Sequence, residues 1–287
     1  MSRLIDRLLL LLKFLSVFGA RGVPIAWKLY VGRRGKLVRV RLPGGHPVLV
    51  RKRSCDVAVF RTAFVEREYD AMVFPQGAAL AARYQDILAR GRKPLVIVCG
   101  ANTGSSSIFF ALQFPQATVV ALEPSRDNFE LLCRNAEFYQ PILPIQAGIW
   151  DKKTWLKIMN PADEPYKYRT VECPPDEPGA MATLGIGEVL ERFPEGEALL
   201  ADIDVEGAEF ALFRDHVSWV TRIPLLIIEL HDWLLPRQKT SSNLISVVAG
   251  LDCDVAIRGE NLLVFNWAAL LPPEALAATR CTDVAER

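Results

Sequence analysis

The sequence predicts an α/β fold with a doubly wound, mostly parallel sheet and helices on both faces. Apolar runs of strand length alternate with helical patterns from residue 95 onward, which is the order expected of βαβ units. The first run ends in a glycine-rich loop, and the next ends in an acidic residue about twenty positions later. The last two runs are joined by a short turn, so the final strand can run antiparallel at or near an edge. We therefore expect a Rossmann-like sheet.

An N-terminal extension precedes this sheet. Residues 1–18 hold an apolar run that Lys13 interrupts; it is too short to cross a bilayer of ~30 Å and predicts an amphipathic helix. Residues 36–50 alternate apolar and polar side chains around a Pro-Gly-Gly turn, which predicts a β-hairpin. The 287 residues suffice for one large α/β domain with such an extension. We divide the chain into the extension, residues 1–53, and the domain, residues 54–287.

The elements of the domain follow from periodicity. A helix is expected over residues 57–72 and a further short helix or turn over 84–88. The predicted strands cover residues 95–99, 118–122, 142–149, 155–159, 198–205, 225–230, 253–257 and 261–265. The predicted helices between them cover residues 105–114, 127–138, 187–193, 208–216 and 244–249. Residues 160–181, rich in Pro, Glu and Asp, form a long irregular excursion of the kind that is often functional.

Charge is unevenly placed along a chain whose net charge is only +1. Residues 1–70 contain fifteen Lys or Arg and five Asp or Glu. This excess indicates an anionic partner, such as lipid headgroups on a membrane surface, a charged glycan or another protein, or else a solvated basic face. The N-terminal helix lies on a membrane, packs on its own domain, or packs on a second subunit of a homo-oligomer. Nucleic acid is not expected, because basic and aromatic residues are not interleaved into a known module.

The cysteines and histidines argue against a structural metal. Six widely spaced cysteines contain no CxxC pair, and there are three histidines, so we expect no zinc and no other structural metal. Free thiols favour a reducing compartment. We expect a cytoplasmic protein. Its N-terminal residues can also contact the inner face of a membrane.

The glycine-rich loop is the first candidate binding site. It consists of Gly100, Ala101, Asn102, Thr103 and Gly104, and it follows a predicted buried strand. Glycine permits a positive φ or a close approach of a ligand to the backbone, and the serines that follow begin a helix whose N–H groups can bind a carboxylate. The loop has no P-loop lysine and lacks the third glycine of the dinucleotide fingerprint. It therefore favours S-adenosylmethionine (SAM) over a di- or triphosphate ligand.

Glu123 ends the next predicted strand, and Pro124 stops that strand. Ligands of open α/β sheets bind in the crevice at the carboxyl ends of the strands, where an acid can accept hydrogen bonds from both ribose hydroxyls. Glycine loop and acid together, at this spacing, predict a nucleoside site. An exposed acid at a strand end is the competing interpretation.

Two further strands end in polar residues. Asp202, Asp204 and Glu206 share one side of an extended chain, because side chains of a strand alternate. Glu229 and His231 have the same parity at the end of the following strand. Imidazole has a suitable pKa for removing a proton near neutrality. We expect His231, Asp204, Glu206 and Glu229 to be the catalytic residues, while a helix-capping role competes with this interpretation for Glu206 or Glu209.

These motifs carry a family resemblance. The segments 100–104, 123–129, 203–209 and 228–231 together resemble the FkbM-type SAM-dependent methyltransferases, over about residues 55–265. The resemblance implies a Rossmann-like seven-stranded sheet, SAM as cofactor, and O-methylation of hydroxyls on sugars or natural products. Two positions depart from the family pattern: Val98 stands where members often have Asp, and Asp202 where they often have Lys.

The expected reaction is transfer of a methyl group to a hydroxyl of a sugar, glycolipid or natural product. Glu123 binds the ribose with Asn128 as a second ligand, and the adenine lies near Ala147, Gly148 and Ile149. Pro124, next to Glu123, is a further expected cofactor-binding residue. The methionine end meets the glycine loop and Asp204, and His231 removes the acceptor proton. A version in which the acidic residues hold Mg²⁺ is possible but not favoured. Two further classes of protein are compatible with the motifs: a non-catalytic SAM-binding or scaffold protein, and an NAD-dependent oxidoreductase.

Overall fold

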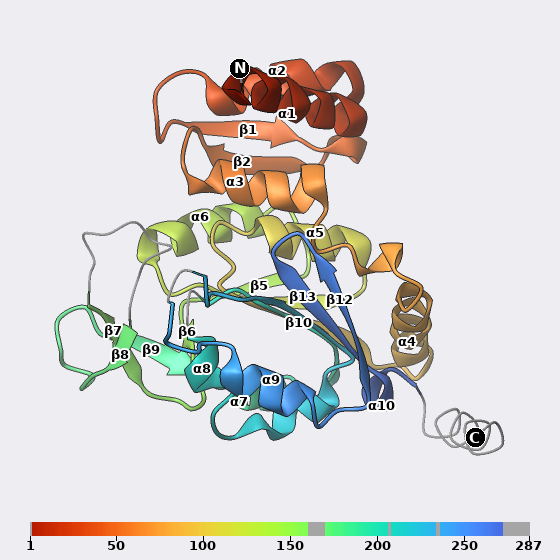
Figure 1. Ribbon diagram of the computed structural model, residues 1–287, viewed down its shortest axis with the longest axis vertical. Helices are drawn as coiled ribbons and strands as arrows, with labels where there is room; N and C mark the ends of the chain where they lie inside the picture. Colours follow the sequence, from red (N-terminus) through yellow and green to blue (C-terminus); the bar gives the residue numbers. More distant parts are fainter. Residues whose placement is uncertain (1, 160–169, 206–207, 234–235, 272–287) are drawn as a thin grey trace.

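A seven-stranded sheet forms the centre of the computed structural model, which describes residues 2–159, 170–205, 208–233 and 236–271 (Figure 1). In spatial order its strands are β12 (Cys253–Arg258), β13 (Asn261–Asn266), β11 (Leu225–Glu229), β10 (Gly196–Ile203), β3 (Lys93–Cys99), β4 (Thr118–Leu122) and β5 (Ile142–Ile145). β13 runs antiparallel to both of its neighbours, and the other adjacent pairs are parallel. The predicted fold class is confirmed, including the antiparallel strand near the edge.

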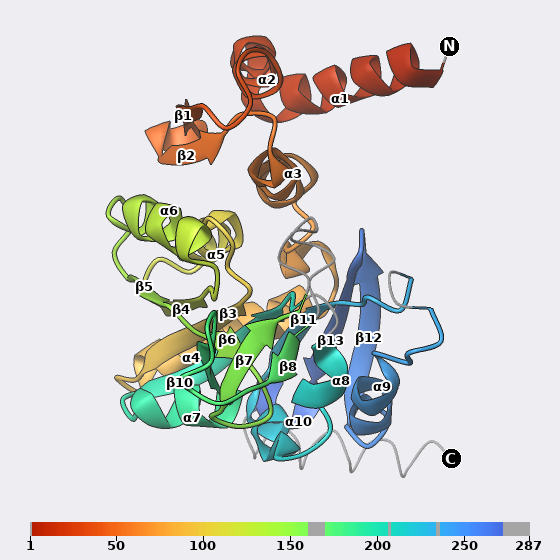
Figure 2. The same ribbon diagram turned by 90° about the vertical axis from the view of Figure 1, so that its left-hand side faces the viewer.

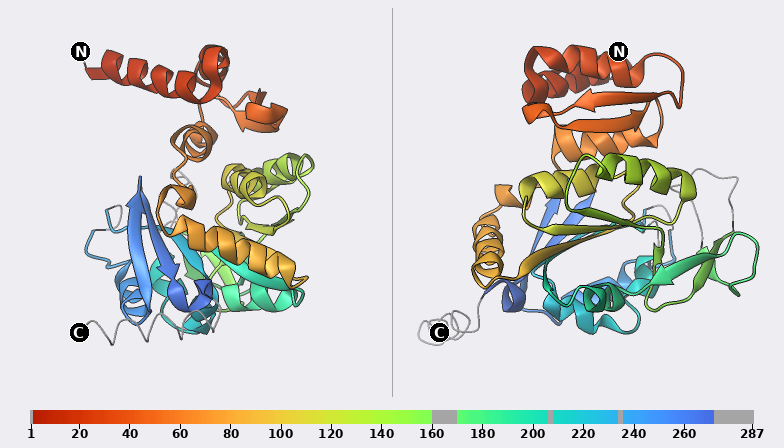
Figure 3. Two further views of the ribbon diagram at one scale, coloured as in Figure 1. Left: turned by 90° about the vertical axis from the view of Figure 1, so that its right-hand side faces the viewer. Right: turned by 180° about the vertical axis from the view of Figure 1, so that it is seen from behind.

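Helices cover both faces of the sheet (Figure 3). On one face lie α4 (Gly77–Ala89), α5 (Ser105–Gln113) and α6 (Arg126–Ala136). On the other lie α7 (Ile186–Arg192), α8 (Glu209–Leu212) and α9 (Ser242–Val248), and the short α10 (Trp267–Leu270) follows β13. The strand alternation explains these layers: Val96 and Val98 of β3 point into the first core, and Leu95 and Ile97 into the second.

A second, smaller sheet corrects one predicted strand. Residues 142–149 do not form one strand, because the chain turns tightly after β5, where Ala147 N–H donates to the carbonyl of Ile145 at 3.0 Å. The remainder becomes β6 (Gly148–Ile149) of a four-stranded sheet in the order β6, β9 (Met181–Leu184), β7 (Trp155–Ile158) and β8 (Thr170–Glu172). Part of the predicted irregular excursion is therefore regular structure, and residues 160–169 lie outside the described residues.

Two predicted helices also differ from the structure. The predicted helix over residues 57–72 ends early, as α3 (Cys55–Arg61) followed by a π-type turn, Thr62–Glu66, after which Arg67 adopts a left-handed conformation. The short helix expected over 84–88 is the thirteen-residue α4. Its apolar spacing at Leu80, Tyr84 and Ile87 places one side of the helix in the core.

The N-terminal extension contains the expected helix and hairpin, and a second helix between them. α1 (Ser2–Phe18) is followed by a short 3₁₀ turn, Gly19–Arg21, then α2 (Gly22–Tyr30), β1 (Leu37–Arg41) and β2 (Pro47–Arg51). Of the described residues, one stretch, Leu8–Tyr30, is long and apolar enough to cross a membrane by length and composition. The 3₁₀ turn divides it, and the two helices cross at a steep angle (Figure 2).

Candidate functional site

The carboxyl ends of the central strands bring the predicted residues to one edge of the sheet. β3 leads into the glycine loop, β4 into Glu123, β10 into Asp204, and β11 into Glu229 and His231. This edge is the crevice at which open α/β sheets bind ligands. Glu206, the remaining catalytic candidate, lies outside the described residues.

The glycine loop needs glycine for two physical reasons. Gly100 has φ 83°, and a Cβ built on it would lie 1.8 Å from the backbone oxygen of Asp204. The loops after β3 and β10 are therefore packed backbone to backbone, and Asp204 N–H donates to the carbonyl of Cys99 at 3.0 Å. Gly104 has φ 94°, and its Cβ would lie 2.8 Å from Leu132 of α6. A side chain at either glycine would push the loop away from its neighbours.

Glu123 is buried at the end of β4 and is bound to the glycine loop. Its Oε2 accepts a hydrogen bond from Asn102 N–H at 2.9 Å, and its Oε1 accepts from Ser125 N–H at 2.9 Å and from Asn128 Nδ2 at 3.4 Å. Burial raises the pKa of Glu123 to about 7, although these donors and the nearby Arg51 act in the opposite direction. Glu123 is therefore not an exposed acid at a strand end.

The neighbours of Glu123 include the rest of the predicted nucleoside site. Asn128, the second predicted ribose ligand, donates to Glu123 and accepts from Arg51 Nη2. Gly148 lies beside Pro124, since a Cβ on this glycine would lie 4.0 Å from the Pro124 Cβ. Ala147 precedes it and is buried. Pro124 and Gly148, which are 24 positions apart in sequence, are therefore neighbours in the structure.

The extension reaches this site through residues that no sequence motif marks. Arg51, at the end of β2, forms a two-point ion pair with the fully buried Asp56, at 2.8 and 2.9 Å. The pair crosses the predicted domain boundary after residue 53. Asn135 of α6 makes a second connection: it accepts from Leu49 N–H at 2.8 Å and donates to the Thr103 carbonyl at 2.8 Å. The contacts of Asn135 join residues far apart in sequence, so no local pattern signals them.

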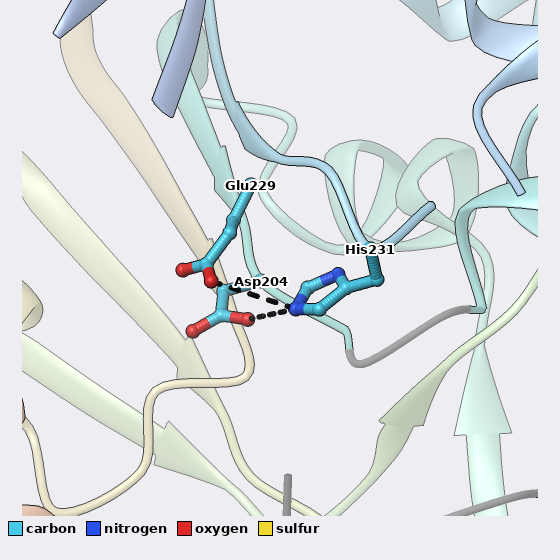
Figure 4. Close-up of side chains that lie close together, drawn as sticks. All are labelled: Asp204, Glu229 and His231. Carbon is cyan, nitrogen blue, oxygen red and sulfur yellow. Dashed lines mark ion pairs between the residues drawn. The ribbon is translucent and has the colours of Figure 1, made fainter. Parts of the chain in front are cut away.

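Three of the catalytic candidates converge at the ends of β10 and β11 (Figure 4). His231 Nε2 lies 3.7 Å from Asp204 Oδ1 and 3.6 Å from Glu229 Oε1. The ring is almost fully buried. Its other nitrogen, Nδ1, contacts Glu209 Oε1, and Glu209 is fully buried as well. Glu209 therefore orients the imidazole, a role that goes beyond capping a helix.

Electrostatics at this cluster favour protonated carboxyl groups. Burial, followed by repulsion from Asp204, raises the pKa of Glu229 to about 8. Burial also raises the pKa of Asp202 well above its usual range, with Asp204 as the next cause. Asp202 lies directly opposite Val98 in the β10–β3 register, so the two departures from the family pattern are neighbours. Tyr69 also lies in this field, and its pKa is raised by burial and then by Asp202.

A divalent cation is another group that this cluster could hold. One donor atom each from Asp204, Glu229 and His231 lies within 4.8 Å of the others. Mg²⁺ prefers an all-oxygen, octahedral shell that keeps several waters. A buried imidazole as one of three protein donors fits Mg²⁺ poorly and fits a transition metal better.

Comparisons with known proteins give no family. No protein-family model matches the chain, and no curated protein matches it. Among solved structures, it is similar to an O-methyltransferase from Bacillus cereus in complex with SAH, with 10% identity over 73% of this chain and 91% of that chain and a TM-score of 0.37.

Two more solved structures show a similar likeness. One is a precorrin-6y C5,15-methyltransferase from Geobacter metallireducens, with 13% identity, coverage of 66% and 86%, and a TM-score of 0.34. The second is an rRNA methylase from Streptococcus thermophilus, with 10% identity, coverage of 65% and 94%, and a TM-score of 0.36. At these scores the likeness carries no argument about activity, and the fold assignment stands on the strand order itself.

Proposed function

We propose that this chain is a SAM-dependent methyltransferase that transfers a methyl group to an acceptor hydroxyl. The observation that carries the proposal is Glu123, a buried carboxylate at the end of β4 that is hydrogen-bonded to the backbone of the glycine loop. A carboxylate offers about four lone-pair positions. Asn102 and Ser125 N–H occupy two of them at 2.9 Å, so a ribose diol would fill the rest by displacing the longer hydrogen bond from Asn128, at 3.4 Å. The absent third glycine argues against a dinucleotide pyrophosphate.

A buried acceptor atom in the glycine loop also favours SAM as the ligand. Asn102 Oδ1 is buried and accepts no hydrogen bond from the described part of the chain. A buried acceptor without a donor is costly, and the ammonium group of the methionine portion is a donor of the required kind. Glu123 would hold the ribose, and Ala147, Gly148 and Ile149 would line the adenine, with Pro124 beside Gly148. Gly100–Gly104 with Asp204 would face the methionine end. When bound, SAM supplies an electrophilic methyl group on a sulfonium.

His231 is the proposed base for the acceptor hydroxyl. Glu209 fixes the ring through Nδ1, which leaves Nε2 as the atom that receives the proton. Asp204, whose Oδ1 lies 3.7 Å from Nε2, would stabilise the imidazolium that results. Much of the rate then comes from alignment of the acceptor oxygen, because the donor is already reactive.

The proposed acceptor class is a hydroxyl of a sugar, glycolipid or natural product, which is what the resemblance to FkbM-type enzymes implies. The proposed location is cytoplasmic. The test has two stages. Titration calorimetry with SAM and with NAD should show heat with SAM only; binding of NAD in its place would contradict the proposal.

The second stage is a mass-spectrometric screen of hydroxylated acceptors with SAM present. A gain of about 14 Da, the CH₂ that replaces a hydrogen, identifies the acceptor and the reaction. Binding of SAM without transfer to any acceptor would favour a non-catalytic scaffold, which the Val98 departure supports.

A further inference from the structure

The helix pair α1–α2 leaves an apolar surface uncovered. On α1, Leu8 and Leu12 are 57% and 52% exposed, and Ile5 and Leu9 are similarly exposed. Spacing of three and four places these side chains on one face of the helix. On α2, Trp27 is 68% exposed, with Val23 one turn before it. We call these six residues, Ile5, Leu8, Leu9, Leu12, Val23 and Trp27, the outer apolar face.

The opposite face of the pair is already used for packing. Phe14 is fully buried and contacts the rings of Phe18 and Tyr30. Phe18 stacks on Phe60 of α3, and Leu29 of α2 is fully buried. The exposure of the outer apolar face is therefore a property of a helix pair that is firmly attached to the rest of the molecule. Large apolar patches on a soluble surface usually mark an interaction site.

The extension that carries this face is strongly basic. Residues 1–53 contain thirteen Lys or Arg and one Asp, a net charge of +12. The exposed cations in the described part of the extension are Lys13, Arg21, Lys28, Arg33, Arg34, Lys36, Arg39, Arg41 and Arg53. Within the described part of the extension, the ion pairs are those of Lys13 with Glu66 and of the half-buried Arg51 with Asp56. An apolar face on an extension of this charge is complementary to an anionic bilayer surface, where burial of apolar side chains and attraction to charged headgroups both favour binding.

We propose that the outer apolar face docks on an anionic membrane, with α1 and α2 lying in the plane of the headgroups. A second copy of the chain fits less well, because it would bring two +12 extensions together. A single transmembrane span fits less well too, because the 3₁₀ turn at Gly19–Arg21 bends the stretch and its inner side chains are buried in protein. Trp27 is suited to the membrane–water interface because its indole ring has an apolar body and a polar N–H group.

Vesicle flotation of the full chain tests this proposal directly. Neutral phosphatidylcholine vesicles and vesicles with about 30% phosphatidylglycerol are compared at low and high salt. The protein should float with the anionic vesicles, bind neutral ones at least about tenfold more weakly, and dissociate when salt screens the headgroups. Equal binding to both vesicle types, or none to either, would overturn the proposal.

A matched pair of variants tests the face itself. Leu8→Glu, Leu12→Glu and Trp27→Glu together should lower vesicle binding by at least about tenfold. The control carries the same three added charges on the domain, as Val73→Glu, Val255→Glu and Ile257→Glu, at side chains that are 53%, 52% and 73% exposed; it should bind as the wild type does. If the triple variant floats normally, or if light scattering shows that it dissolves a wild-type dimer, the surface serves another partner.

Two further measurements show whether a loss of vesicle binding comes from misfolding or from a change at the proposed SAM site. Thermal melting should be unchanged in the triple variant, since the three side chains are already solvent-exposed. SAM affinity should be unchanged as well, so loss of vesicle binding is independent of methyl transfer. In the wild-type chain, brominated lipids should quench tryptophan emission, and Trp27→Phe should remove most of that quenching. Quenching that persists in Trp27→Phe would contradict the placement.

Discussion

Glu209 holds His231 by its Nδ1 atom, from 22 residues upstream, and both side chains are buried. The contact leaves Nε2 toward Asp204 and Glu229, at the sheet edge where the acceptor would enter. This arrangement fixes the tautomer: with Nδ1 engaged by a carboxylate, Nε2 is the atom that can exchange a proton. A buried carboxylate beside a ring nitrogen also favours the imidazolium form during turnover.

Replacing His231 by Ala should lower kcat by about 10²- to 10⁴-fold, the usual contribution of a general base. SAM affinity measured by calorimetry should stay within about threefold, because the ring contacts no predicted cofactor residue except Asp204. Glu209→Gln should give a smaller loss and a shifted pH–rate profile, since it weakens orientation but keeps the base. His216→Ala, at an exposed histidine, is the control. Full activity in His231→Ala would refute the base assignment.

SAM affinity should depend on the protonation of Glu123. Its pKa of about 7 means that the carboxyl is increasingly protonated below neutrality. If the ionised form accepts the ribose hydroxyls, Kd should rise by up to about tenfold per pH unit below 7. Calorimetry at pH 6 and pH 8 measures this dependence.

Two variants separate this effect from the titration of other groups. Glu123→Gln should bind SAM about 10- to 100-fold more weakly at pH 8 and lose the pH dependence, because it removes a charged acceptor. Glu130→Gln on the exposed face of α6 should behave as the wild type. Equal wild-type affinity at pH 6 and pH 8 would contradict the ribose role.

Folding stability should decrease as pH rises from about 5 to about 8.5. Glu123 and Glu229 have pKa values raised to about 7 and about 8, while the unfolded chain titrates near the ordinary value. The native state therefore keeps protons that the unfolded state has released, and stability is lost as pH rises through these native pKa values. For Glu123 alone the loss is on the order of 3 kcal/mol. Urea unfolding across this range measures it.

The same measurement has an internal control. Glu123→Gln cannot ionise, so its stability should fall less steeply with pH than that of the wild type. A wild-type free energy of unfolding that rises between pH 5 and pH 8.5 would show that these carboxyls are not titrating as their burial implies.

Metal removal should leave methyl transfer unchanged. The raised pKa of Glu229 and the imidazole donor both disfavour Mg²⁺ at the Asp204–Glu229–His231 cluster. Activity after dialysis against EDTA should therefore equal that of the untreated enzyme within about twofold. Loss of activity that added Mg²⁺ or Mn²⁺ restores would instead make the cluster a metal centre, with the acceptor hydroxyl activated by the ion.

Sequence patterns identify those parts of the fold that depend on local chemistry. Buried strands such as β3 and β10 are continuous apolar runs, and Gly100 and Glu123 mark strand ends by residue type alone. The four-stranded sheet could not be predicted in this way, because β6 has only two residues and pairs with β9, more than thirty positions later. Short strands carry too little periodicity to be detected.

Long-range pairs explain the rest of the difference. Glu209 looks like a capping acid until the fold brings His231 beside it. Arg51 looks like one more member of a basic run until the fold brings Asn128, 77 residues later, into hydrogen-bond contact with it. In both cases the informative fact is a tertiary contact, and one sequence without its fold does not contain it.

The contacts of Asn135 and Arg51 couple the unfolding of the hairpin to that of the central sheet. They join the hairpin to the glycine loop and to the neighbours of Glu123, so cleavage near residue 53 would leave buried polar groups unsatisfied in both fragments. Heating should accordingly melt the hairpin and the Rossmann-like sheet in one cooperative transition. A protease nick in that connection would then disrupt the glycine loop and the surroundings of Glu123 even where α1 and α2 stay attached to the hairpin.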